Sequence, residues 1–152
     1  MNEFSVKIIV ATHKKYQMPS DQMYIPIHVG ADGKKDAEGN DLDFGYIKDN
    51  TGDNISNLNP SFCELTGLYW AWKNLDADYI GLVHYRRHFS KKRKVGFENV
   101  LTYKELRPYL GSTKIFVPNK RRYYIETLYS HYAHTHYAAH LDETRKIIAD
   151  KY

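Results

Sequence analysis

Three short apolar runs along the chain have the length and composition of β-strands. They are FSVKIIVA (4–11), YIPIHV (24–29) and the first half of YIGLVHYRRHF (79–89). β-Branched and aromatic residues dominate them, as in the half-buried surface of a sheet. The last run has too little polar alternation for a surface strand, so we expect a central strand buried on both faces. Pro26 lacks the amide hydrogen that a ladder needs, which predicts an edge position for the second strand.

A helix is predicted between the second and third of these runs. It begins at an Asn59 N-cap, has Pro60 at its first position and continues to about Asn74. Gly67 costs about 1 kcal/mol relative to alanine inside a helix, so we expect close packing at this position. Four residues recur at helical spacing and form the expected core face: Phe62, Leu65, Tyr69 and Trp72.

The rest of the chain predicts shorter elements. Thr102 and Glu105 fit a capping box for a short helix that ends near Leu110. Strands and helices in this order predict an α/β sandwich, with a mostly parallel central sheet flanked by helices. Three further elements are expected: a strand at 112–118, a helix at 123–132 and an amphipathic helix at 141–152.

Composition narrows the class of protein. Hydrophobic residues make up 42% of the 152 residues, which suits one globular domain spanning 1–152. The formal charge of +4 fits partners that carry phosphate. The lone Cys63 excludes an intrachain disulfide, and no apolar run is long enough to span a bilayer. We therefore expect a cytoplasmic protein, whose cationic run at 91–94 is a solvated loop or touches anionic lipid.

Polar and cationic residues follow directly after two of the predicted strands. The first strand ends in Thr12 and His13. Ligands of open α/β sheets bind in the crevice outside the carboxyl ends of the strands. Because arginine pairs with phosphate in two-point contacts, the pattern predicts an anion site; the alternative is a solvated basic turn. Two histidines and two arginines end the run at 79–89: His84, Arg86, Arg87 and His88.

The long polar segment 30–57 separates the second strand from the helix. Loops of this length inside a domain are usually functional or disordered. Asp49, Asp53 and Asn54 lie near its end, where they either bind a metal ion or a sugar hydroxyl, or form an Asx-type turn.

Four histidines lie close together near the end of the chain, at positions 131, 134, 136 and 140. They are a conceivable zinc set, because histidines three residues apart share a helix face. The chain has no cysteine nearby and no HExxH motif, so hydrogen bonds to a substrate or a pyrophosphate are the favoured role.

Five strings occur together in one order, and the pair ELTGLYWAWKN and GLVHYRRHF is especially specific. They resemble a family encoded in bacterial capsular and exopolysaccharide loci, domain of unknown function 4422, described as glycosyltransferases with a GT-A-like, Rossmann-like fold. The resemblance covers essentially the whole chain. The strings are IVATHK (9–14), PIHVG (26–30), TGDNIS (51–56), ELTGLYWAWKN (64–74) and GLVHYRRHF (81–89).

The resemblance implies an enzyme of the hexosyltransferase type. It would move a sugar from a nucleotide donor, expected to be a UDP-sugar, to a lipid-linked glycan at the inner face of the plasma membrane. Members of the family are longer than this chain, so we expect the N-terminal part of a longer domain, without part of the acceptor site.

GT-A enzymes commonly hold a divalent metal ion with an Asp-x-Asp motif, and none follows the strand at 79–83. Asp41-Leu42-Asp43 and Asp76-Ala77-Asp78 fit the letters but not the position. We therefore expect no metal site. The HYRRH string (84–88) is instead expected to stabilise the negative charge of the departing diphosphate.

On this interpretation each candidate residue has a role. His84, Arg86 and Arg87 contact the diphosphate, and Glu64 is a base or an acceptor ligand. The nucleotide or donor sugar is expected to contact six further residues: Thr12, His13, Asp49, Asp53, Asn54 and His88.

Two alternatives remain open at this point. Basic residues interleaved with aromatic ones, at 84–89 and 120–124, also suit a module that binds RNA or another phosphate-rich ligand. Against it, the positive charge lies at strand ends rather than along one face, so no nucleic-acid partner is expected. The other alternative is an inactive partial glycosyltransferase domain.

Overall fold

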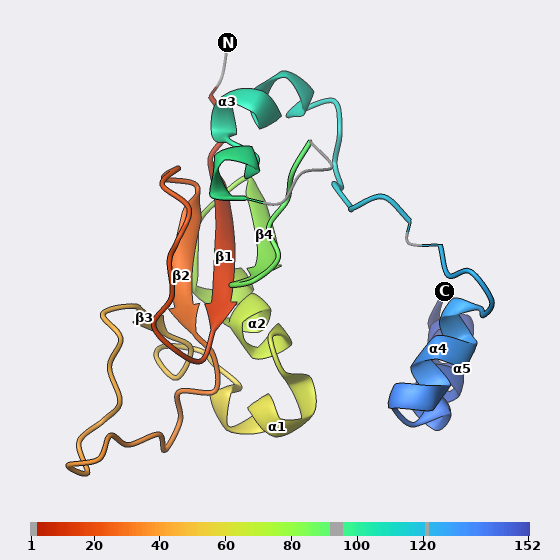
Figure 1. Cartoon of the computed structure of the whole chain (residues 1–152), viewed down its shortest axis with the longest axis horizontal. Coiled ribbons are helices and arrows are strands. Elements are labelled where there is room, and N and C mark those ends of the chain that lie inside the picture. Colours follow the sequence, from red (N-terminus) through yellow and green to blue (C-terminus); the bar gives the residue numbers. More distant parts are fainter. Residues whose placement is uncertain (1–2, 92–95, 121) are drawn as a thin grey trace. The chain divides into compact units, whose positions relative to one another are not determined.

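The computed structural model describes residues 3–91, 96–120 and 122–152 (Figure 1). The contacts divide the chain into two compact units, Met1–Phe116 and Val117–Tyr152. The first unit contains the sheet and every predicted site residue outside the histidine-rich segment. The second contains two helices.

The first unit is built on a parallel sheet of four strands in the order β3-β2-β1-β4 (Figure 1). Thr12 lies beside His28 and Ala11 beside His84, so the three longer strands end together at one edge. The prediction of a parallel sheet in an α/β fold is confirmed. The strands are β1 (Val6–Thr12), β2 (Tyr24–His28), β3 (Ile47–Lys48) and β4 (Tyr79–His84).

The central strand is β1, not the strand at 79–84. Ile9 and Val10 of β1 are fully buried, whereas β4 lies at the end of the strand order and is mostly half-buried. The central position predicted for β4 is therefore wrong within the described residues. The strand is apolar because its side chains pack against helical segments on both faces of the sheet, although it has one strand neighbour, β1. Pro26 lies just before the two residues of β2 that pair with β3, so β2 is an inner strand only at its carboxyl end.

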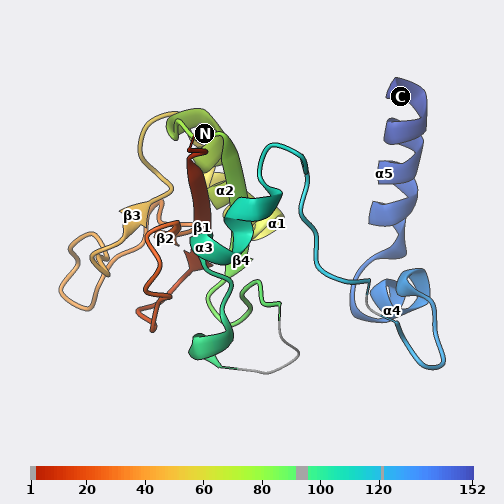
Figure 2. The ribbon, with the colours of Figure 1, turned by 90° about the horizontal axis from the view of Figure 1, so that it is seen from above.

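One face of the sheet is covered by α2 (Leu65–Asn74), which follows the short α1 (Asn59–Phe62) (Figure 2). A Cβ on Gly67 would lie 2.8 Å from Val29 Cγ1, which confirms the expected close packing. The buried core of this face contains Ile9, Ala11, Ile27, Val29, Trp70 and Ala71.

The predicted core face of this helix is wrong. Phe62, Leu65 and Trp72 are 45%, 50% and 64% exposed. The helix is interrupted at Cys63, whose φ of 47° and ψ of −128° reverse the backbone, so spacing counted across the break fails. The residues of α2 that are buried are Thr66, Gly67, Trp70 and Ala71.

The other face of the sheet packs against the segment that contains α3 (Tyr103–Leu106), near the amino ends of the strands (Figure 1). Thr102 and Glu105 form the predicted capping box. The short helix α3 continues into a 3-10 turn, η3 (Arg107–Tyr109), which contains Pro108. Two further 3-10 turns are η1 (Ser56–Leu58) and η2 (Phe97–Asn99).

The strand predicted at 112–118 is wrong, since Ile115 and Val117 are 78% and 76% exposed and extend without a ladder. In the second unit, α4 (Leu128–Thr135) starts five residues later than predicted, at a Thr127 cap, and α5 (Ala138–Lys151) starts earlier. Neither helix buries a residue. Within the described ranges, no helix combines the length and apolarity needed to cross a membrane.

Candidate active site

A cavity of about 240 Å³ lies at the carboxyl edge of the sheet. It is bounded by the ends of β1 and β4 and by the junction between α1 and α2. Side chains at this edge come from four separate parts of the sequence, which the parallel strand order brings together. The lining residues are Ala11, Thr12, His13, Val29, Asn59, Cys63, Glu64 and His84.

Glu64 and His84 lie next to each other in this cavity. Glu64 Oε1 lies 3.7 Å from His84 Nε2. The backbone amide of Arg86 donates to His84 Nδ1 over 3.1 Å, so the neutral imidazole carries its proton on Nε2, toward Glu64. Burial lowers the pKa of His84, and Arg86 and Arg87 lower it further, while Glu64 opposes them. The 3.7 Å contact is longer than a hydrogen bond, but it places an imidazole N–H beside a carboxylate, as around a general base.

The two arginines occupy a tight turn directly after β4. His84 O accepts a hydrogen bond from the amide of Arg87 over 2.8 Å, which closes the turn and leaves both guanidinium groups exposed. The Arg86 guanidinium lies 5.3 Å from the centre of the Tyr85 ring. Exposed arginines on a closed turn are available to an anion in solution.

A third cation, Lys14, was missed by sequence reasoning. Its ammonium group lies 5.3 Å from the Tyr85 ring and 5.9 Å from the Tyr16 ring. The Tyr85 ring is buried and also contacts His13 and His84, at 5.4 Å and 4.2 Å between ring centres. The available signal was the position of Lys14, immediately after two predicted site residues.

Thr12 and His13 reach the cavity in different ways. Thr12 is buried, and its hydroxyl donates to Lys14 O over 2.6 Å and accepts from the Lys14 amide over 3.2 Å. It therefore shapes the turn after β1. His13 is exposed beside the cavity and is free to meet a ligand.

Asp49 is fully buried, and its carboxylate lies within the protein rather than in the cavity. It accepts hydrogen bonds from the amides of Gly30 and Ala31, over 2.8 and 3.0 Å. The hydroxyls of Ser56 and Thr66 donate to it as well. With these four contacts its oxygens are occupied, so the structure does not place it where a sugar hydroxyl could bind.

Asp53 and Asn54 also lie away from the cavity. Asp53 accepts a 3.0 Å hydrogen bond from the Tyr69 hydroxyl, and its carbonyl accepts from Asn74 Nδ2. Asn74 is the last residue of α2, and Glu64 lies just before the first residue of this helix. At about 1.5 Å per residue, the two ends are about 15 Å apart, so Asp53 is not brought to Glu64.

His88 is directed into the core rather than the cavity. Its ring packs against Tyr24 and Phe97, at 6.2 and 5.4 Å between ring centres. Its Nε2 is buried without a hydrogen-bond partner, and burial lowers its pKa. The turn at Arg86 and Arg87 reverses the chain, which separates His88 from the arginines next to it in sequence.

Residues 7–152 match a family described as a domain of unknown function, DUF4422. The chain belongs to the DUF4422 family. Among solved structures, the apo structure of the WbbM bifunctional glycosyltransferase is similar, with a TM-score of 0.50 and 43% sequence identity. The match covers 60% of this chain but only 16% of that one. No curated protein sequence matches the chain.

The predicted GT-A-like fold is confirmed by the parallel sheet, its flanking helices and this neighbour. The neighbour also relates this DUF4422 chain to glycosyltransferases, as the resemblance implied.

The Asp-x-Asp candidates do not fit a metal site of the GT-A type. Asp41 pairs with Lys35 at 2.6 Å, and Asp43 accepts from the amide of Gly45. Asp78 accepts from the amide and hydroxyl of Ser5, at the amino edge of the sheet. Among the described residues that line the cavity, Glu64 is the one carboxylate, and no described group of three or more His, Cys, Asp or Glu is placed to hold a metal ion.

The histidine-rich segment of the second unit has a different arrangement. His131 Nδ1 and His134 Nδ1 lie 3.3 and 3.1 Å from the carboxylate of Glu126. Tyr123 stacks on His131 at 4.3 Å between ring centres. The four histidines therefore do not converge, and those near Glu126 share one carboxylate.

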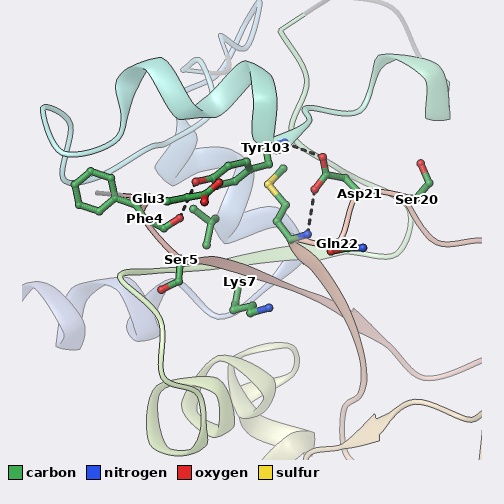
Figure 3. Close-up of a pocket in the computed structure, with 10 residues that line it drawn as sticks. Glu3, Phe4, Ser5, Lys7, Ser20, Asp21, Gln22 and Tyr103 are labelled. Atoms are coloured by element: carbon green, nitrogen blue, oxygen red, sulfur yellow. Dashed lines mark hydrogen bonds between the residues drawn. The ribbon is translucent and has the colours of Figure 1, made fainter. Parts of the chain in front are cut away.

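A larger hollow of about 680 Å³ lies at the opposite, amino edge of the sheet (Figure 3). Two of the polar side chains that line it, those of Asp21 and Tyr103, hold neighbouring backbone in place. Asp21 accepts from the amides of Met23 and Tyr103, over 3.0 and 2.8 Å, and the Tyr103 hydroxyl donates to Phe4 O. These contacts hold α3 on the sheet, so this hollow is a packing feature, and the smaller cavity is the better candidate.

Proposed function

We propose that this chain carries the nucleotide-sugar part of a glycosyltransferase site. The observation that carries the proposal is the convergence of three exposed or half-exposed cations, Lys14, Arg86 and Arg87, beside the Glu64–His84 pair. Fixed positive charge next to one carboxylate suits a reaction in which a diphosphate departs while a hydroxyl loses its proton.

The proposed step balances without a metal ion. The oxygen of an acceptor hydroxyl attacks the anomeric carbon of the donor sugar, and the bond from that carbon to the diphosphate oxygen breaks. The diphosphate leaves with the electron pair and is held by Arg86 and Arg87 in charge-assisted hydrogen bonds. The hydroxyl proton passes to Glu64, which His84 orients from Nε2.

The planar base of the donor would lie on Tyr16, whose ring is 42% exposed. The backbone of Tyr16 is held in place, because the Tyr46 hydroxyl donates to Tyr16 O over 2.9 Å and accepts from its amide. The Tyr16 ring itself packs edge-on against Tyr85, at 5.0 Å between ring centres. Lys14 lies over the same ring. A fixed aromatic ring beside a cation is suited to a nucleotide, since bases stack on aromatic rings and phosphates attract the charge.

The finer assignment rests on the family resemblance. The donor would be a UDP-sugar, and the acceptor a lipid-linked glycan of capsular or exopolysaccharide synthesis. Most of the cationic run that would touch anionic lipid, at 92–94, lies outside the described residues. The chain spans 16% of its structural neighbour, so the activity of the whole protein belongs to this proposal.

The test is calorimetric titration with UDP, with and without manganese. Arg86→Ala should weaken UDP binding about tenfold or more, because a charge-assisted contact is lost. The matched control is Arg107→Ala, which removes an exposed arginine at the amino edge and should change nothing. Manganese should not be required.

Three outcomes would contradict the proposal. Binding that needs manganese would restore a carboxylate metal site. A folded protein that binds no nucleotide would reject the donor site altogether. Binding of single-stranded RNA that falls steeply with salt and that UDP does not displace would favour the nucleic-acid alternative.

A further inference from the structure

We propose that Asp49 is a positioning residue for Glu64, acting through a relay of hydrogen bonds that fixes the reversed backbone at Cys63. Asp49 touches neither the cavity nor Glu64. The role of Glu64 as a base rests on the proposed function, but the relay itself does not.

The relay begins at the buried carboxylate. The Thr66 hydroxyl lies 2.6 Å from Asp49 Oδ2 and 3.1 Å from Cys63 O, and its one hydrogen takes the shorter contact, to the carboxylate. Its oxygen then accepts from Asn59 Nδ2 over 3.0 Å. The same amide nitrogen donates to Cys63 O over 2.7 Å. One amide group with two hydrogens therefore joins the Thr66 hydroxyl to the Cys63 carbonyl.

Cys63 is where this relay acts on the site. Among the described residues, it is the one non-glycine residue with a positive φ. Unusual backbone of this kind persists where its surroundings determine it, and such positions cluster at functional sites. The next residue is Glu64, so the direction of the backbone at Cys63 determines the direction in which the Glu64 side chain leaves the backbone. Holding the Cys63 carbonyl therefore holds Glu64 beside His84.

The neighbouring loop is fitted to the same relay. Gly30 donates its amide to Asp49, and a Cβ at Gly30 would lie 2.5 Å from Asn59 Cγ. Any side chain at Gly30 would thus clash with Asn59, and the glycine gives Asn59 the space that it occupies. Ser56 also donates to Asp49 but has no further link to Cys63 in the relay. It offers a control that loosens the carboxylate without cutting the relay.

The experiment follows the titration of His84 by NMR in the full chain, with labelled histidine and His84→Gln for assignment. Among the described residues, the charged and titratable groups that interact with His84 are Glu64, Arg86, Arg87, His13 and His88. Because Glu64 raises the pKa of His84, Glu64→Gln should lower it. Moving Glu64 away should lower it equally, whereas general loosening would expose the half-buried imidazole further and raise its pKa.

Thr66→Val removes the hydroxyl at constant shape and should lower the His84 pKa as far as Glu64→Gln does. Thr66→Ser keeps the hydroxyl and should restore the wild-type value. Combining Thr66→Val with Glu64→Gln should give no further change. Asn59→Ala cuts the relay at a half-buried position and serves if Thr66→Val does not fold.

Two results would overturn the inference. One is a wild-type His84 pKa in both Thr66→Val and Asn59→Ala. The other is a Ser56→Ala variant that changes the His84 pKa as much as Thr66→Val, since that would indicate loosening rather than a relay. In transfer assays, Thr66→Val should lower kcat about tenfold or more with the affinity for UDP unchanged. Absence of any transferase activity would reject the proposed function and leave the NMR result standing.

Discussion

The two edges of the sheet make opposite use of their polar residues. The amino edge has the larger hollow, yet the Asp21 carboxylate and the Tyr103 hydroxyl at this edge bond to backbone groups that hold α3 in place. The carboxyl edge has the smaller cavity, and its arginines, Lys14 and His13 are exposed. Because satisfied polar groups stabilise the fold while exposed converging charge awaits a partner, charge identifies the site better than volume does.

The two edges also differ in how they fix their shape. At the amino edge, Asp21 is half-buried and joins two segments. At the carboxyl edge, Asp49 is fully buried and joins the loop after β2, the start of η1 and the start of α2. The buried carboxylate of Asp49 therefore holds the segments that surround the cavity. The exposed residues that face a ligand do not have to stabilise the fold.

The largest expected effect separates these two aspartates. Asp49→Ala leaves buried amides and hydroxyls without an acceptor and should lower the free energy of unfolding by about 3 kcal/mol. Asp21→Ala should lower it by about 1 kcal/mol, because water reaches the freed amides. Urea denaturation followed by the fluorescence of buried Trp70 measures both. Equal losses would show that the edges are stabilised alike.

Sequence reasoning succeeded where the signal is local. Apolar runs located the three longer strands, and the residues directly after them proved to line the cavity at Thr12, His13 and His84. The helical core face failed because the backbone reverses at Cys63, which no spacing reveals. The buried, structural role of Asp49 had no local signal either, since its partner Thr66 lies 17 residues away.

The same limit explains why the candidate set was too wide. Arg87 and His88 are adjacent in the sequence, but the turn after β4 exposes one and places the other in the core. Asp53 was predicted to hold the donor in the same site as Glu64, but its carbonyl is bound by Asn74, at the other end of α2. Local patterns indicate which residues carry chemistry, while tertiary contacts decide which of them meet.

A second, intermediate effect compares exposed tyrosines on the two edges. Tyr16 and Tyr109 are 42% and 47% exposed, and each has a lysine over its ring. Tyr16→Ala should weaken UDP binding about tenfold, because one base–aromatic stack is lost, and should leave pyrophosphate binding unchanged. Tyr109→Ala should change neither in calorimetry. Equal weakening of pyrophosphate by Tyr16→Ala would assign this ring to the phosphates instead of the base.

The smallest expected effect concerns the loss of stability at acidic pH. His28 at the carboxyl edge is 2% exposed, its Nδ1 has no hydrogen-bond partner, and burial lowers its pKa below the usual 6.5. A lowered folded-state pKa contributes stability above the unfolded pKa, and this stability is lost as the pH falls through the folded pKa. His28→Phe removes the titration and keeps a ring against Phe44. The fall in Tm between pH 7.5 and 5.0 should therefore be smaller in His28→Phe than in the wild type. An unchanged fall would mean that acid acts elsewhere, and hydrogen exchange at the amides of Gly30 and Tyr24 would then show which edge opens first.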